Sequence, residues 1–179
     1  LKPASEKAFK KLFGLVGFEI IKGIYPKLSR RKITKIVNDH DDIFVNKTRN
    51  HLKPFKDAKP TLEKLKKKYK IALISNCKKR EILVSLKASR LNLNLFDALI
   101  GHDSVKKPKP YPDEILKAQK VLHQKAKYII GDSIYDIIAG KRARVKTIAI
   151  VTGNHTMGEL KKEKPDFLFK RFQDVLQIL

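Results

Sequence analysis

The sequence has few of the features that mark secreted, disulfide-bonded or membrane-spanning proteins. Its 179 residues include a single cysteine, Cys77, so no disulfide can form within the chain. This composition is usual in a reducing cytoplasm. No apolar run approaches the roughly 18 residues that a membrane span requires. The first residues, LKPASEKAFKK, show no signal-peptide pattern. We therefore expect a cytoplasmic protein with no membrane segment.

Negative charge is also scarce. The chain carries 41 Lys and Arg against 18 Asp and Glu, a net charge of +23. Such a charge attracts anions and is common in nucleic-acid-binding proteins. However, the lysines are spread along the whole chain, and there is no zinc-finger spacing, no aromatic RNP-type strand and no Arg-rich arm. These absences argue against nucleic acid as the main partner. We attribute the charge instead to a generally basic surface. Its field would also favour the binding of a small phosphorylated substrate.

The apolar pattern divides the chain into two parts. Residues 1–52 lack strand alternation, and Ser5–Gly17 has apolar residues at helical spacing. Ser29 is placed to cap a second helix, which we expect to end at a polar break, Asn38–Asp42. We therefore predict a small helical unit over residues 1–52 and a separate core over residues 53–179.

In the core, short apolar runs alternate with helix-length amphipathic segments. We expect strands at Lys70–Ser75, Phe96–Ile100, Ala126–Ile130, Thr147–Val151 and Phe167–Phe169. We expect helices at Thr61–Tyr69, Lys79–Ser89, Asp113–His123, Tyr135–Arg144 and Met157–Lys162, with a last helix running to Leu179. This alternation predicts an α/β fold, a Rossmann-like parallel sheet with helices on both faces. Apolar runs such as KIALIS are typical of strands buried inside such a sheet.

Polar residues follow several of these strands. Ser75 and Asn76 directly follow KIALI. Asp132 directly follows YIIG, and Asp136 lies one helical turn after Asp132. Lys109 lies between two prolines in the connection KKPKPYPD. Ligands of parallel α/β sheets bind beyond the carboxyl ends of the strands. We therefore expect these side chains to converge on one rim of the sheet.

The residue types on this rim suit phosphate chemistry. Asp132 and Asp136 share one face at a helix start, and their hard oxygens suit Mg²⁺. The same spacing also fits an alternative, in which Asp132 caps the helix and Asp136 interacts with its dipole. Ser75 is placed to donate its hydroxyl to a phosphate oxygen. Lys109, held between prolines, loses less entropy on being positioned beside a phosphoryl group.

In order and spacing, the segments IALISN, KPYPD and IIGDSIYD resemble the phosphoglycolate-phosphatase-like branch of the haloacid dehalogenase superfamily. The resemblance runs from about Pro54 to Leu179. It implies a Mg²⁺-dependent phosphatase that hydrolyses a small phosphate monoester. It also implies that the helices of residues 1–52 form the small cap of that family.

The resemblance gives each residue on the rim a role. Ser75 and Asn76 would hold the transferring phosphoryl group. Lys109 would stabilise the charge of that group and orient the nucleophile. Asp132 would bind Mg²⁺ directly, with Asp136 assisting through the metal or its water.

One family feature is missing from the sequence. The nucleophile belongs to a DxDx(T/V) motif at the end of the first strand, before the cap, and this chain has no such motif. Asp39 and Asp41 have the DxD spacing but lie in the helical region without the Thr or Val. We expect the chain to begin just after the motif, with the nucleophile upstream of Leu1. The alternative is a catalytically inactive protein of the same fold whose basic surface binds an acidic partner or RNA. Neither the substrate nor the oligomeric state is predicted.

Overall fold

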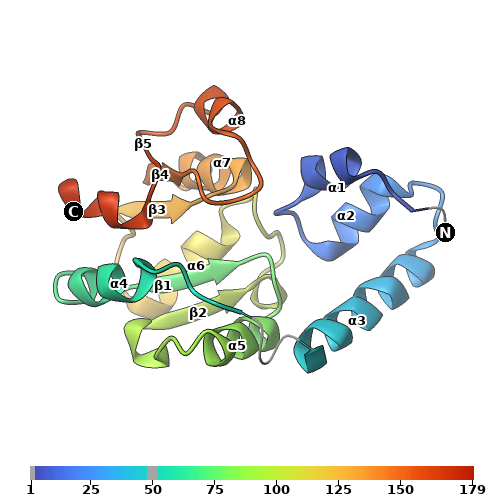
Figure 1. Ribbon diagram of the computed structural model, residues 1–179, viewed down its shortest axis with the longest axis horizontal. Helices are drawn as coiled ribbons and strands as arrows, with labels where there is room; N and C mark the ends of the chain where they lie inside the picture. The colour runs from blue at the N-terminus through green and yellow to red at the C-terminus, as the bar shows by residue number, and fades with distance from the viewer. Residues whose placement is uncertain (1–2, 48–51) are drawn as a thin grey trace.

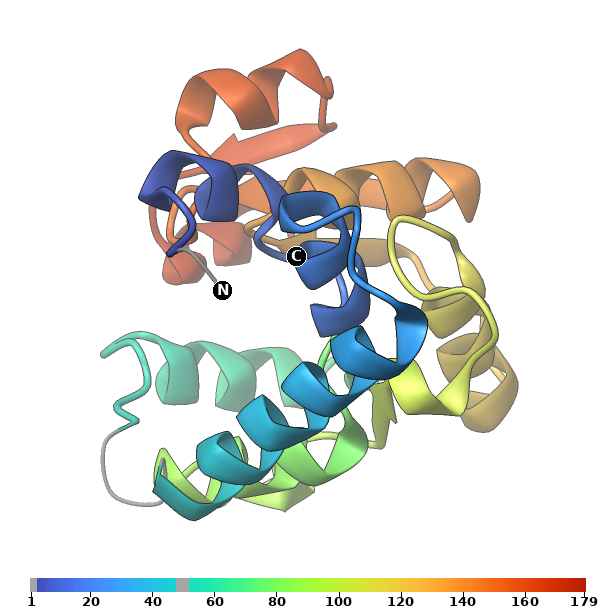
Figure 2. The same cartoon turned by 90° about the vertical axis from the view of Figure 1, so that its right-hand side faces the viewer.

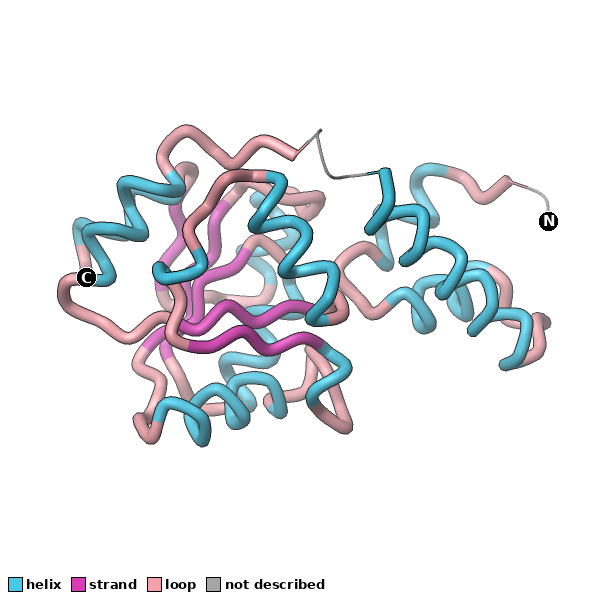
Figure 3. The backbone as a smooth tube through the Cα atoms, turned by 90° about the horizontal axis from the view of Figure 1, so that it is seen from below, coloured by secondary structure: helices cyan, strands magenta, loops and turns pink. Residues whose placement is uncertain are grey.

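The computed structural model describes residues 3–47 and 52–179. Three N-terminal helices lie to one side of the strand-containing remainder (Figures 1 and 3). They are α1 (Glu6–Leu12), α2 (Gly17–Ile24) and α3 (Arg30–Lys47). None of the helices in the described ranges is long and apolar enough to cross a bilayer.

The remainder alternates strands and helices, as the sequence predicts. The strands are β1 (Ala72–Ser75), β2 (Ala98–Gly101), β3 (Tyr128–Gly131), β4 (Lys146–Ile150) and β5 (Phe167–Phe169). The α-helices are α4 (Ala58–Lys66), α5 (Lys79–Ala88), α6 (Asp113–Leu122), α7 (Ile134–Arg142) and α8 (Met157–Lys162). The described residues also include the 3₁₀ helices η2 (Leu93–Leu95), η3 (His102–Ser104) and η4 (Phe172–Gln177).

All strand pairs are parallel, and they fall into two sheets. One sheet pairs β1 with β2, with Ile74 opposite Ile100. The other has the order β3-β4-β5, with Ile130 opposite Ile148. Helices lie on both sides of the strands (Figure 3). The predicted α/β class is therefore confirmed, with the described strands divided between β1 and β3.

The predicted polar break at Asn38–Asp42 is wrong, because α3 continues through it to Lys47. The polar residues there have partners that keep them in the helix. Lys35 Nζ lies 2.8 Å from Asp39 Oδ2, one turn away. The buried Asp41 carboxylate is paired with Lys78, at the start of α5, at 2.7 Å. Figure 2 shows α3 crossing in front of the core helices.

Three other predicted boundaries differ. The helix expected over Ser5–Gly17 is interrupted at Gly14, whose φ of +102° lies in the left-handed region that favours glycine. The helix expected over Thr61–Tyr69 begins three residues earlier, at Ala58, with Pro60 in its first turn, where a missing N–H costs nothing. The final segment is the 3₁₀ helix Phe172–Gln177 instead of a longer α-helix.

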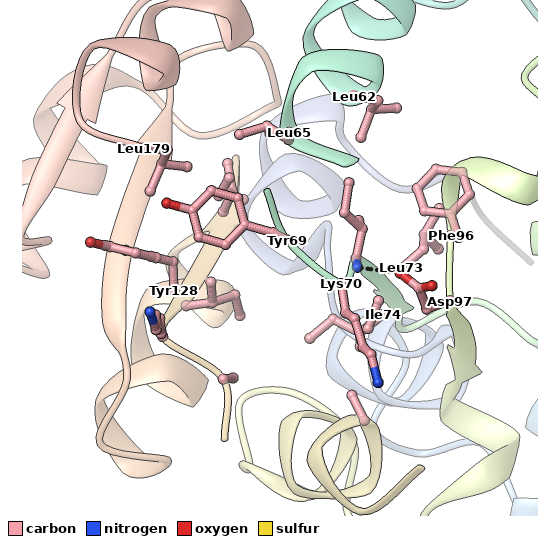
Figure 4. A pocket seen from close by; sticks show the side chains of 18 of the residues that line it. Leu62, Leu65, Tyr69, Lys70, Leu73, Ile74, Phe96, Asp97, Tyr128 and Leu179 are labelled. Atoms are coloured by element: carbon pink, nitrogen blue, oxygen red, sulfur yellow. Dashed lines mark hydrogen bonds between the residues drawn. The ribbon is translucent and has the colours of Figure 1, made fainter. Parts of the chain in front are cut away.

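Burial differs sharply between the strands. In β4, which is paired on both sides, every residue after Lys146 is buried. In β1 all four residues are only half-buried, so the prediction that KIALIS is a buried strand is wrong. The reason is that β1 pairs with β2 alone, among the described strands, and its other edge borders a cavity (Figure 4). In β3, whose unpaired edge borders the same cavity, only Ile129 is buried.

Candidate functional site

The candidate site lies at the carboxyl ends of β1 and β3, on the side of the sheets that faces α1 and α2 (Figure 1). β1 ends in Ser75 and is followed by Asn76, and Asp132 follows β3. The loop between η3 and α6 contributes Lys109. The structure thus gathers segments that are far apart in the sequence.

Lys109 is held through its side chain and through its backbone. Its Nζ lies 2.9 Å from Asp136 Oδ1, and the residue is only 9% exposed. Its backbone N–H donates to Glu114 Oε2 at 3.1 Å. Its carbonyl accepts from Asn76 Nδ2 at 2.9 Å. The ends of β1, α6 and α7 therefore fix this cation jointly.

The electrostatic surroundings keep Lys109 charged. Burial alone would lower the pKa of Lys109, but the carboxylates of Asp136 and Glu114 outweigh it and hold the pKa above its ordinary value. Burial raises the pKa of Glu114, and the Lys109 cation offsets part of that rise. A fixed, desolvated ammonium is suited to neutralising an anionic group that arrives beside it.

The first turn of α7 tests the alternative interpretation of the aspartate pair, in which Asp132 caps the helix. Ser133, not Asp132, caps the helix, because its hydroxyl accepts from the N–H of Tyr135 at 3.2 Å. Asp136 completes a capping box by accepting from the N–H of Ser133 through Oδ2 at 3.1 Å. The alternative is therefore wrong for Asp132, which does not cap the helix. Asp136 lies in the first turn, as that alternative expects, and its part in the capping box was not predicted. Asp136 has both oxygens engaged, one with the helix and one with Lys109.

The carboxylate of Asp132 does not cap α7, since Ser133 is the cap. A Cβ at Gly153 would lie 2.6 Å from the Asp132 carboxyl carbon, so only glycine permits this close approach of the two loops. Burial, followed by the negative charge of Asp136, raises the pKa of Asp132. A half-buried and a buried acidic group at one strand end favour the approach of a cation.

Asp132 and Asp136 are the predicted ligands of Mg²⁺. Among the residues that the structure describes, there is no group of three or more His, Cys, Asp and Glu side chains able to hold a metal ion. Mg²⁺ commonly takes only one or two protein carboxylates and completes its shell with water and phosphate oxygens. The Asp132 carboxylate fits that demand, while both oxygens of Asp136 already accept hydrogen bonds, so Asp136 is suited to assisting beside the metal. The chemistry of the site is therefore compatible with the predicted metal.

Ser75 and Asn76 lie where predicted, with contacts that the sequence did not predict. Ser75 Oγ accepts from the backbone N–H of Cys77 at 3.1 Å. Asn76 Nδ2 donates to the Gly14 carbonyl at 2.7 Å as well as to Lys109. Asn76 therefore links the loop between α1 and α2 to the lysine loop. The predicted phosphoryl contacts of Ser75 and Asn76 stay predictions.

Three residues of the site were missed from the sequence. Glu114 holds the Lys109 backbone, and Gly14 accepts from Asn76. His155 is buried, and its ring meets the ring of Tyr135 edge-on at 5.8 Å. Glu114 follows the KPYPD segment directly, which was a usable signal. Nothing in the sequence marks Gly14.

The comparisons with known proteins bear on the family to which the chain belongs. A family model described as haloacid dehalogenase-like hydrolase matches residues 1–150. The chain belongs to this family. The resemblance drawn from the strand-end motifs is thereby confirmed.

Individual relatives share between 21% and 27% sequence identity with this chain. A pyrophosphatase, PpaX, of Bacillus thuringiensis is 27% identical over 165 residues, covering 87% of this chain and 73% of the relative. A hydrolase from Pseudomonas syringae superposes with a TM-score of 0.86 at 21% identity, covering 98% of this chain and 82% of that one. A predicted phosphoglycolate phosphatase from Haemophilus somnus gives a TM-score of 0.85 at 22% identity, covering 99% and 84%. At these identities the two structures establish the fold alone.

Proposed function

We propose that this protein is a Mg²⁺-dependent phosphatase that hydrolyses a small phosphate monoester in the cytoplasm. The observation that carries the proposal is the fixed Lys109 cation, 2.9 Å from Asp136 and at the same strand ends as Asp132. Membership of the haloacid dehalogenase-like hydrolase family supports it. The relatives described as a pyrophosphatase and a phosphoglycolate phosphatase point to phosphorylated substrates of small size.

Each residue of the site has a proposed task. Lys109 binds the phosphoryl oxygens, offsets the charge that develops on them and orients the attacking carboxylate. Asn76 positions Lys109 through its carbonyl, and Ser75 contributes a hydroxyl to the phosphoryl group. Asp132, with Asp136 beside it, would hold Mg²⁺, which neutralises phosphoryl oxygens when bound. The nucleophile is an aspartate that we place upstream of Leu1, and it would form an aspartyl-phosphate that water hydrolyses.

The basic surface favours the same substrate class. A net charge of +23 raises the local concentration of small anions around the whole molecule. The same charge is the one observation that favours the inactive binding protein as a second candidate. In that case the chain would bind an acidic partner or RNA with a steep dependence on salt and would hydrolyse nothing.

The test is the hydrolysis of a panel of phosphate monoesters by the protein that includes the residues expected before Leu1. Lys109→Ala should lower the rate by about 10²–10³-fold, as removal of one preorganised charge-stabilising group does. Lys107→Ala is the matched control, since Lys107 is an exposed lysine two residues away. Full activity in Lys109→Ala would refute the assignment.

A further inference from the structure

The loop that carries Lys109 is closed as a tight turn. The backbone N–H of Tyr111 donates to the Pro108 carbonyl at 3.0 Å, so Lys109 and Pro110 are the two central residues of the turn. Pro110 has no backbone N–H, which leaves its carbonyl as its one polar backbone group. Lys109 is buried, whereas the side chain of Tyr111 is 46% exposed. The turn therefore has a buried residue and an exposed residue only two positions apart.

Arg142 contacts the exposed part of this turn. It lies in the last turn of α7, and its Nη1 donates to the Pro110 carbonyl at 2.8 Å. Its guanidinium carbon also lies 5.0 Å from the centre of the Tyr111 ring, a cation–π contact. A guanidinium suits this double task, because its planar group can donate a hydrogen bond and lie over a ring at the same time. One side chain thus binds the two residues that directly follow Lys109.

Helix α7 therefore contacts the lysine loop through both of its ends. Asp136, in its first turn, pairs with Lys109 Nζ at 2.9 Å. Arg142 lies about 9 Å further along the helix axis. A loop that is bound to a helix at one point can pivot about that point, whereas two separated contacts fix its orientation. Since α7 begins just after Asp132, the contacts of Arg142 help to fix the position of Lys109 relative to both aspartates.

The contacts of Arg142 gain importance when a phosphoryl group binds. Lys109 Nζ then has to share its hydrogen bonds between Asp136 and the phosphoryl oxygens, which loosens the ion pair between the loop and α7. The contacts of Arg142 do not involve the Lys109 ammonium, so this sharing leaves them in place. A misplacement of about 1 Å in an active site can lower a rate by about 10²-fold. A contact that holds the loop while the ion pair is shared therefore protects the rate.

We propose that Arg142 is a positioning residue, which holds the Lys109 turn against α7 through the Pro110 carbonyl and the Tyr111 ring. This role rests on the proposed function, because it concerns the placement of Lys109 beside a phosphoryl group. The alternative is that Arg142 only balances the negative end of the α7 dipole, as a cation in a last turn does. Lys141 would then be equivalent to Arg142, although Lys141 contacts the Glu163 carbonyl instead of the loop.

Lys107 provides a matched control. Its ammonium also lies over the Tyr111 ring, at 5.3 Å, but among the described residues its side chain makes no hydrogen bond to the loop. Lys107→Met removes one cation and one ring contact. Arg142→Met removes the same two features and, in addition, the hydrogen bond to the Pro110 carbonyl. Both side chains are exposed, so both variants should fold, and the comparison isolates the hydrogen bond.

The first experiment measures activity in the protein that includes the residues expected before Leu1, on a phosphate monoester that it hydrolyses. Arg142→Met should lower kcat by about tenfold, as expected for the loss of one hydrogen bond from a charged group. It should leave KM within about twofold, because the loss concerns the transition state. Lys107→Met and Lys141→Met should both stay within about twofold of the unchanged protein. Full activity in Arg142→Met, or an equal loss in Lys141→Met, would overturn the proposal.

A double-mutant cycle shows whether Arg142 acts through Lys109. In Lys109→Ala there is no ammonium left to position, so adding Arg142→Met should cause less than about twofold further loss of kcat. A role of Arg142 in the general stability of the fold would lower kcat by the same factor in both backgrounds. A further tenfold loss in the Lys109→Ala background would therefore overturn the proposal.

The second experiment, hydrogen exchange on the 179-residue chain, needs no catalysis. The Tyr111 amide is bonded to the Pro108 carbonyl and the Lys109 amide to Glu114. In Arg142→Met both amides should exchange at least about fivefold faster, while the amides of β4 should be unchanged. Unchanged exchange at both amides would overturn the proposal. Equal acceleration throughout the chain would overturn it as well, because Arg142 would then only stabilise the fold.

The two experiments separate this inference from the proposed function. If no phosphate monoester is hydrolysed but both amides exchange faster in Arg142→Met, the hold of Arg142 on the turn stands and the proposed function fails. If Lys109→Ala is inactive while Arg142→Met is fully active, the proposed function stands and this inference fails.

Discussion

The ion pair between Lys109 and Asp136 allows a quantitative prediction about stability. The Nζ–Oδ1 distance is 2.9 Å and both side chains are nearly buried. Removing one partner of a buried pair typically costs about 3–5 kcal/mol, because the remaining charge is left without compensation. In Lys109→Met, Asp136 keeps its bond from the Ser133 N–H, so the loss should lie near the lower limit, at about 3 kcal/mol.

For a chain of this size, a loss of about 3 kcal/mol corresponds to a fall of roughly 6–12 °C in the melting temperature. Urea unfolding followed by circular dichroism measures the loss directly, and Lys107→Met serves as the exposed control. Adding Asp136→Asn to Lys109→Met should recover at least about 1 kcal/mol, since it removes the unpaired charge and keeps the acceptor for Ser133. A loss below about 1 kcal/mol in Lys109→Met would refute the reasoning.

Two further predictions concern the same part of the fold. The pKa of Asp132 is raised in the folded state, so its ionisation lowers stability once the pH exceeds the ordinary value of about 3.9. In calorimetry without Mg²⁺, Asp132→Asn should therefore raise the melting temperature at pH 7, and this gain should disappear near pH 4. A gain in melting temperature that is the same at both pH values would contradict this. Gly140→Ala should lower the free energy of unfolding by about 1–3 kcal/mol, measured with urea. The reason is that the added Cβ would lie 2.5 Å from Ile129 Cγ2 and from Thr147 Cγ2. An unchanged free energy of unfolding would contradict this and show that these side chains move aside.

The order of strands and helices was predictable because it depends on local patterns. Short apolar runs between amphipathic segments have few alternatives to a parallel α/β fold. The rim was predictable for a related reason, since parallel strands bring their carboxyl ends to one side. Asn76 and Lys109 followed from this rule, and the structure joins them by a hydrogen bond.

What the sequence did not predict depends on contacts between distant segments. The continuation of α3 through Asn38–Asp42 depends on Lys78, far along the chain, which pairs with the buried Asp41. The sequence suggested Asp132 as a possible cap of α7, but the cap is Ser133, and only the position of its hydroxyl reveals this.

The most direct test of phosphoryl transfer at these strand ends is the dependence of hydrolysis on Mg²⁺ and on Asp132. The protein with the residues expected before Leu1 is assayed on a panel of phosphate monoesters, with Mg²⁺ and with EDTA, beside Asp132→Asn. We predict turnover that requires Mg²⁺ and falls by about 10²–10³-fold in Asp132→Asn. Turnover that is equal in EDTA, or equal in Asp132→Asn, would contradict the account.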